Sequence, residues 1–129
     1  QLLLAVGTVA VLIFRASATT QTVKVGALVE LNGEVTPAGF VLAVEDINSL
    51  QLLPNVTLQW EVENDPCAQI ETMKGLISVV KKNAVAIFGM QCYCHEVSVY
   101  LGAMQLPGAT TECVFPDFSQ RNLYPTFIR

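Results

Sequence analysis

The first mature residues are β-branched and apolar, as in a strand, and the apolar residues that follow recur every three to four positions, as in a helix. This change predicts a strand followed by a helix. Residues 22–31, TVKVGALVEL, are rich in β-branched and apolar residues, which is typical of a strand. After Thr36, a favourable N-cap, the apolar residues Phe40, Val44 and Ile47 recur at helical spacing. The first two elements are therefore a strand and an amphipathic helix that packs on it.

The same pattern recurs in the next part of the chain. Residues 56–65 alternate as a strand, and Asp65-Pro66 is expected to open a second helix. The apolar stripe predicted for that helix consists of Ile70, Met73, Ile77 and Val80. Residues 84–88, AVAIF, form a continuous apolar run, as expected for a strand covered on both faces.

A third helix is expected over about residues 95–105, with Val97, Leu101 and Met104 on one side. Residues 106–112, LPGATTE, are a candidate fourth strand, and residues 113–129 are expected to be mostly loop. Alternation of strands and helices predicts a doubly wound α/β fold with a parallel sheet. No internal domain boundary is visible.

Composition and motifs exclude several functions. The formal charge is −4, and the only adjacent basic pair is Lys81-Lys82, so nucleic acid is not expected as a partner. Neither G-x-G-x-x-G nor G-x-x-x-x-G-K is present, so the phosphate cradle of nucleotide-binding α/β folds is missing and no cofactor is expected. There is no G-x-S-x-G motif and no serine, histidine and aspartate grouping, so no catalytic residue and no enzyme activity are predicted for this chain.

The first residues suggest export. Residues 2–14 are an uncharged apolar run, and Ala16-Ser17-Ala18 fits a small-residue cleavage site. Residues 1–18 are interpreted as a signal peptide whose start is missing, with the mature part, residues 19–129, beginning near Thr19. A membrane-spanning helix needs about 20 apolar residues and is the weaker interpretation. The sequon Asn55-Val56-Thr57 predicts glycosylation at Asn55.

Four cysteines invite three interpretations: Cys67, Cys92, Cys94 and Cys113. The spacing does not match common structural zinc sites, so no metal is expected, and Cys-x-Cys is not the Cys-x-x-Cys of redox centres. An oxidising compartment favours two disulfides, for which three pairings are possible. Cys92 and Cys94 are too close in sequence to pair comfortably with each other, which narrows the choice. A Cys67–Cys92 bridge would tie the start of the second helix to the loop after the third strand, and it would leave Cys94 to pair with Cys113.

Ligands of such sheets bind at the carboxyl ends of the strands. This rule places four segments on one rim: 32–36, 63–65, 89–94 and 110–114. On that rim His95 is expected to be an exposed residue of the first helical turn, and Glu96 to be favourable beside the helix dipole. Trp60 is expected to be a packing residue.

Six sequence blocks, in order from about residue 23 to residue 129, resemble the receptor ligand-binding region related to type I periplasmic binding proteins. The blocks are VKVGALVEL, AGFVLAVEDIN, LLPNVTLQWEVENDPC, AVAIFGMQC, LGAMQLPGATTEC and LYPTFIR. The resemblance implies that residues 19–129 form the beginning of the first of two lobes. Cys92 follows Cys67 by 25 positions, which is similar to a bridged pair in the receptor guanylate cyclase and natriuretic peptide receptor branch, and Cys94 with Cys113 resembles a second bridge of that branch.

What the resemblance implies about the ligand is more general. Amino-acid-binding members have small hydroxyl residues where this chain has Tyr93 and Cys94, which argues against an amino acid. The resemblance allows an anion nest formed by backbone amides near Gln91 and Cys92. The ligand-binding candidates are Gln91, Tyr93, Thr110 and Thr111.

The resemblance implies that the chain belongs to the extracellular ligand-binding region of a membrane receptor and that this region closes on a peptide or small molecule between two lobes. A receptor guanylate cyclase is the first choice among such receptors. A homodimer and a membrane segment outside this chain are also implied. The alternatives are an extracellular domain like those of ionotropic or metabotropic glutamate receptors and a soluble secreted binding protein of the same fold.

Overall fold

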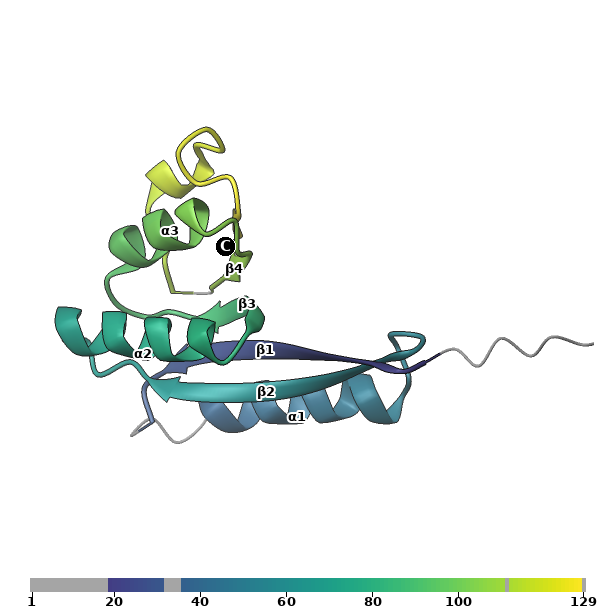
Figure 1. Ribbon diagram of the computed structural model, residues 1–129. Coiled ribbons are helices and arrows are strands. Elements are labelled where there is room, and N and C mark those ends of the chain that lie inside the picture. The colour runs from purple at the N-terminus through teal and green to yellow at the C-terminus, as the bar shows by residue number, and fades with distance from the viewer. Residues whose placement is uncertain (1–18, 32–35, 111, 129) are drawn as a thin grey trace, which may run out of the picture.

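The computed structural model describes residues 19–31, 36–110 and 112–128, and Figure 1 shows their arrangement. The segment interpreted as a signal peptide, residues 1–18, lies outside the described residues. In the described part no helix has the length and apolar character needed to cross a membrane. The elements are β1 (Gln21–Val29), α1 (Thr36–Ser49), β2 (Val56–Asn64), α2 (Gln69–Lys81), β3 (Ala84–Gly89), α3 (Cys94–Ala103), β4 (Gly108–Ala109), the 3₁₀ helix η1 (Pro116–Ser119) and β5 (Phe127–Ile128).

The strands form one parallel sheet in the order β2-β1-β3-β4-β5. Helix α1 lies on one face of the sheet beside β1 and β2, and α2 and α3 lie on the other face (Figure 1). The predicted doubly wound α/β architecture is confirmed. Because all strands point the same way, their carboxyl ends meet at one edge.

Helix α1 is fixed to β2 by polar and apolar contacts. Val44 is buried and Phe40 and Ile47 are half-buried, so the predicted stripe faces the sheet. The Asn48 side chain donates to the Leu58 carbonyl and accepts from the Leu58 amide, both at 2.8 Å. Thr36, expected as the N-cap, is the first residue of the helix.

The stripe predicted for α2 is only partly correct. Met73 and Val80 are half-buried and pack against the core, but Ile70 is 65% exposed. The fully buried residues of the helix are Thr72, Gly75, Leu76 and Val79. A Cβ atom on Gly75 would lie 3.1 Å from the Asn64 carbonyl oxygen, so the glycine lets the helix approach β2 closely. The helix also begins at Gln69 instead of at Asp65-Pro66, because the segment before it forms a loop.

The C-terminal part contains more structure than the sequence predicts. In α3, Val97 and Leu101 are buried as expected, whereas Met104 lies just past the helix end and is 49% exposed. Residues expected to be loop include η1 and β5. Phe118 packs against Tyr124 and Phe127, with ring centroids 4.9 and 5.0 Å away, and this aromatic cluster joins the main core.

Trp60 corrects another expectation. It lies on β2, one of the two edge strands of the sheet, and it is 44% exposed, so it packs only in part and lies outside the core. The core instead lies between the sheet and helices α2 and α3. Its largest fully buried side chains are those of Phe127, Leu28, Leu76, Ile87, Met90 and Leu101.

Candidate functional site

The loops at the carboxyl edge of the sheet contain several residues with left-handed backbone, which also occurs in turns elsewhere in the described residues. Gly89, Met90 and Tyr93, between β3 and α3, have φ values of 87°, 64° and 53°, and Cys67, before α2, has a φ of 53°. Residues other than glycine adopt this conformation at a cost and persist there only when their surroundings hold them in place. The loops at this edge are therefore held by specific contacts.

Gly89 starts the turn that leads from β3 into this edge. A Cβ atom there would lie 2.1 Å from the Leu28 carbonyl oxygen, far inside van der Waals contact. The same oxygen accepts the amide N–H of Met90 at 2.8 Å. A side chain at position 89 would push the loop away from β1.

Asp65 is the buried centre of the edge, with 0% of its surface exposed. Its Oδ2 atom accepts the backbone N–H groups of Gln91 at 3.1 Å and Cys92 at 3.2 Å. Its Oδ1 atom accepts the Thr72 hydroxyl at 2.6 Å and the Cys67 amide at 3.3 Å. One carboxylate thus links the loop before α2 to the loop before α3.

This arrangement corrects the expected anion nest. The amides of Gln91 and Cys92 do point at an anionic group, but that group is the carboxylate of Asp65 from the same chain. The amides are therefore not available to an anionic group of a ligand.

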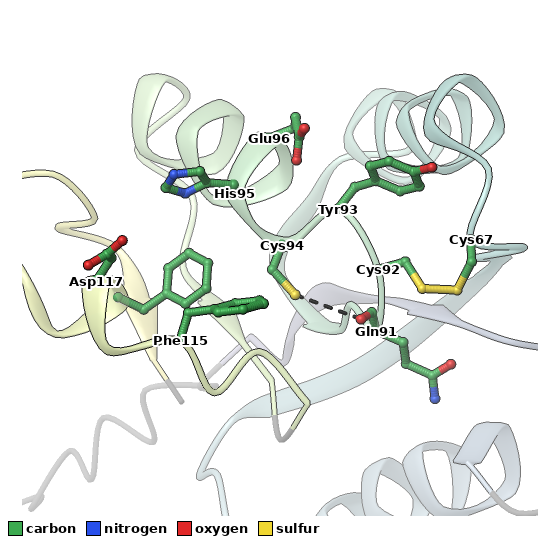
Figure 2. A pocket seen from close by; sticks show the side chains of 10 residues that line it. Cys67, Gln91, Cys92, Tyr93, Cys94, His95, Glu96, Phe115 and Asp117 are labelled. Carbon is green, nitrogen blue, oxygen red and sulfur yellow. Dashed lines mark hydrogen bonds between the residues drawn. A yellow bond between two sulfur atoms is a disulfide. The ribbon is translucent and has the colours of Figure 1, made fainter.

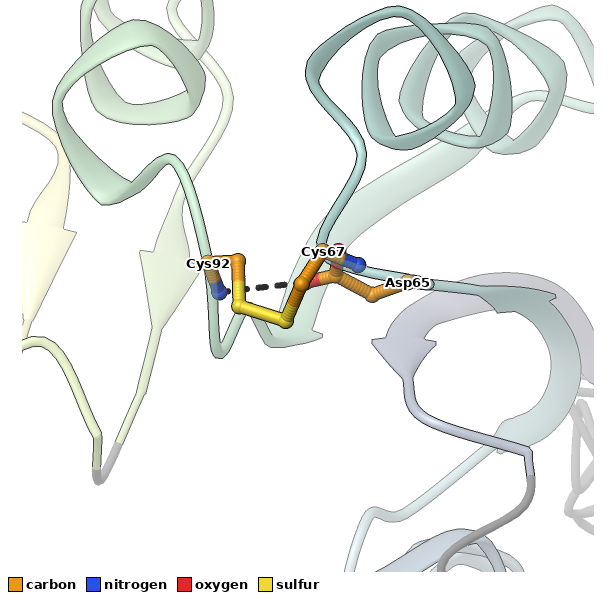
Figure 3. Close-up of side chains that lie close together, drawn as sticks. All are labelled: Asp65, Cys67 and Cys92. Carbon is orange, nitrogen blue, oxygen red and sulfur yellow. Dashed lines mark hydrogen bonds between the residues drawn. A yellow bond between two sulfur atoms is a disulfide. The ribbon is translucent and has the colours of Figure 1, made fainter.

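Two disulfides reinforce the same loops: Cys67–Cys92, with Cα atoms 5.2 Å apart, and Cys94–Cys113, with Cα atoms 5.8 Å apart. This is the pairing that the sequence analysis favoured. Asp65, Cys67 and Cys92 bring potential metal ligand atoms within 4.8 Å of one another (Figure 3). Because the two sulfur atoms are bonded to each other, they offer no thiolate, and the group does not fit a metal.

Thr110, a predicted ligand contact, is only 6% exposed and its hydroxyl is used internally. The hydroxyl donates to the Met90 carbonyl at 2.9 Å and accepts the amides of Glu112 at 3.1 Å and Cys113 at 3.4 Å. It therefore joins the loop after β4 to the loop after β3. Thr111, the other threonine candidate, lies outside the described residues.

A cavity of about 550 Å³ opens beside these loops. Figure 2 shows Tyr93 and the Cys67–Cys92 disulfide on one side of it and Phe115 and Asp117 on the other. Gln91 and Tyr93, two of the predicted contacts, both line it. The full lining consists of Cys67, Gln91, Cys92, Tyr93, Cys94, His95, Glu96, Phe115, Asp117 and Phe118.

His95 and Glu96 lie at the rim of the cavity and are both exposed, as expected for His95, and Glu96 lies in the first turn of α3, as expected. The His95 ring also has a structural contact, because one of its ring nitrogens hydrogen-bonds the hydroxyl of the buried Tyr124. The edge of the same ring meets Phe118, with centroids 5.8 Å apart. Glu96 accepts a long hydrogen bond of 3.5 Å from the side-chain Nε2 group of Gln69.

Sequence reasoning placed Asp65 on the rim but missed its role, and it missed three residues of the far wall. Phe115, Asp117 and Phe118 belong to a segment that was expected to be loop, yet they line the cavity. The available signal was their position directly after Cys113, whose disulfide to Cys94 draws the segment to the rim.

A parallel α/β sheet with a cavity at its carboxyl edge defines a ligand-binding lobe. The profile described as "Receptor family ligand binding region" matches residues 36–129, and the chain belongs to this family. Such regions are binding domains without catalytic activity. A search of curated proteins gave no match.

Among solved structures, the fold is similar to that described as a possible leucine/isoleucine/valine-binding protein from Rhodopirellula baltica SH 1. The TM-score is 0.65 at 14% sequence identity, and the match covers 85% of this chain. The chain spans 32% of the length of that protein. The described part thus has the fold of a fragment of a type I periplasmic-binding-protein-like lobe.

Proposed function

We propose that this chain is the first part of the extracellular ligand-binding region of a membrane receptor, which closes on its ligand between two lobes. The observation that carries the proposal is the cavity at the carboxyl edge, walled by Tyr93 and the Cys67–Cys92 disulfide, in a chain of the receptor family. Family membership and two disulfides indicate an extracellular location. Attachment to the membrane by a segment outside this chain, and homodimerisation, are part of the proposal.

The receptor guanylate cyclase branch is the proposed branch. It is supported by the resemblance of the cysteine pattern, which places one disulfide across 25 positions and the second between the next cysteine of the loop and Cys113. The parent protein would then convert ligand binding outside the cell into cyclic GMP synthesis inside it.

The first experiment is to read the complete open reading frame on both sides of this chain. A second lobe, one membrane-spanning helix, a kinase-like segment and a cyclase domain are the expected result. Seven spans, or a split glutamate-binding module with a pore, would assign the protein to a glutamate-receptor-like branch. A stop codon after the second lobe would make it a soluble binding protein.

Gln91 and Tyr93 are the proposed ligand contacts, because both line the cavity. In the complete receptor, Tyr93→Ala is expected to raise the half-maximal agonist concentration at least about tenfold, because an aromatic wall is lost. Cyclic GMP accumulation measures the response and surface biotinylation measures expression. Tyr93→Phe, which keeps the ring, is the control. An unchanged dose response at normal surface expression would remove Tyr93 from the site.

Asn55 is the proposed glycosylation site. It is exposed in the turn that precedes β2, and Thr57 of the same sequon is exposed as well. Figure 1 shows this turn at one end of β1 and β2, whereas the residues that line the cavity follow the carboxyl ends of the strands, so a glycan on Asn55 leaves the cavity open.

A further inference from the structure

The charges around the cavity give information about the kind of ligand it binds. The Oδ2 atom of Asp65 already accepts hydrogen bonds from the backbone amides of Gln91 and Cys92. These amides are the donors best placed to bind an anionic group of a ligand. Any carboxylate or phosphate of a ligand would have to displace a buried carboxylate that makes four hydrogen bonds. This is unfavourable because displaced Asp65 would remain buried and without its partners.

The side chains that line the cavity carry negative charge. Glu96 lies at the start of α3 and Asp117 lies in η1 on the other side, and both are exposed. No lysine or arginine is among the described residues of the lining. A positively charged group therefore finds complementary charge on both sides of the cavity, whereas an anion meets repulsion.

The walls between these carboxylates are largely aromatic. Tyr93 forms one side, and Phe115 and Phe118 form the other, with the two phenylalanine rings 6.2 Å apart. Aromatic faces attract ammonium and guanidinium groups, by about 0.5–2 kcal/mol for each contact. They also pack against the apolar stem that carries such a group.

We propose that the cavity binds an organic cation, an ammonium or guanidinium group on an apolar stem, and that Asp65 determines this specificity by occupying the anion-binding amides. The inference rests on the proposed function, since it assigns a ligand class to that site. Two sources share this chemistry: the arginine or lysine side chain of a peptide, and a free arylalkylamine.

The test uses saturation-transfer NMR to measure binding to the purified full-length protein. The probes come in pairs whose two members are similar in shape but differ in charge. For free amines the pair is phenethylamine and 3-phenylpropionate, and for peptide side chains it is N-acetylarginine amide and the neutral N-acetylcitrulline amide. We expect signal from the cation of at least one pair and at least fivefold weaker signal from its partner. The pair that responds identifies the source.

Variants connect this preference to the cavity. Glu96→Gln combined with Asp117→Asn is expected to weaken binding of the cation at least threefold at low salt. The matched control is Glu45→Gln with Asp46→Asn, which removes two exposed charges from α1 and is expected to leave binding unchanged. Asp65→Ala, once circular dichroism shows that it folds, is expected to increase binding of 3-phenylpropionate, because the amides become free.

Three results would overturn the inference. They are equal signals from cation and partner in both pairs, no signal from either cation, and equal losses in the cavity variant and the α1 control. None of these results is measured through cyclic GMP or depends on which signalling domain follows the binding region, so a failure of the ligand class is distinguishable from a failure of the receptor assignment.

Discussion

At the scale of single residues, two glycines that look alike in sequence have opposite roles. A Cβ at Gly89 would lie 2.1 Å from the Leu28 carbonyl oxygen at a φ of 87°, whereas a Cβ at Gly39 in α1 meets nothing within 4 Å. We expect Gly89→Ala to lower the free energy of unfolding by about 2 kcal/mol or more. Gly39→Ala should raise it by roughly 0.5–1 kcal/mol, because alanine favours a helix. Urea unfolding of both variants checks the contrast, and equal effects would contradict it.

Asp65 gives a second prediction at this scale. Asp65→Ala leaves the partly buried Gln91 and Cys92 amides without this acceptor, which costs up to about 1–3 kcal/mol for each group. We expect a loss of roughly 3 kcal/mol in the free energy of unfolding, partly restored by formate, which is small enough to replace the carboxylate. Asp46→Ala, an exposed aspartate of α1, is the control and should be nearly neutral.

If formate restored nothing while the variant remained folded, the proposed role of the carboxylate at these amides would be contradicted. The role of Asp65 was not predictable from the sequence. Its four donors come from residues 67, 72, 91 and 92, so their convergence depends on how two loops meet in space.

At the scale of elements, the carboxylate of Glu63 on β2 attaches helix α2 to the sheet, and the strength of this attachment depends on whether the carboxylate is ionised. The Ser78 hydroxyl donates to Glu63 at 2.7 Å and the Lys82 ammonium does so at 2.9 Å, and these bonds, Ser78 first, lower the pKa of Glu63 below its ordinary value of 4.5. A lowered pKa contributes stability that is present above pH 4.5 and is lost as the pH falls through the folded-state pKa. Ser78→Ala should therefore be destabilising at pH 7, and the difference from the wild type should shrink at pH 3.

The measurement is urea unfolding at both pH values. Ser49→Ala is the matched control, because the Ser49 hydroxyl donates to the main-chain carbonyl oxygen of residue 46, a group that carries no ionisable proton. Its effect should be the same at pH 7 and pH 3. A pH-independent effect of Ser78→Ala would show that the bond to Glu63 does not shift the ionisation of this carboxyl in the folded protein.

The order and type of the main elements were predictable, because β-branched runs and helical periods repeat strongly along the chain. The buried face of α2 was not. Two of its four buried residues are Thr72 and Gly75, which an apolar pattern does not count: Thr72 is buried for its bond to Asp65 and Gly75 for close packing. Strand β5 has two residues, too few for a period to be visible.

At the scale of the whole molecule, a glycan on Asn55 would cover exposed leucine side chains at the end of the molecule opposite to the cavity. Leu50, Leu52 and Leu53 are exposed by 68%, 60% and 42% next to Asn55. We expect Asn55→Gln and Thr57→Ala to abolish the mobility shift caused by peptide N-glycosidase at this site, and Thr57→Ser to retain it. Loss of the glycan should also increase aggregation, because the leucines lose their cover.

Mass spectrometry of the peptide that contains Asn55 reads the site directly, since the enzyme leaves aspartate in place of a glycosylated asparagine. An unmodified Asn55 in protein whose two disulfides have formed would show that the protein entered an oxidising compartment and was not glycosylated there. That result would reject the glycan alone.

The two disulfides formed by Cys92 and Cys94 restrain the segment between β3 and α3, and this restraint lowers the entropic cost of ligand binding. Cys92 is tied to the loop before α2 and Cys94 to the loop after β4, so Tyr93 lies between two fixed points. A wall fixed in this way loses little conformational entropy when a ligand arrives. The heat capacity change of binding should then report surface burial between the lobes, with little contribution from ordering of this loop.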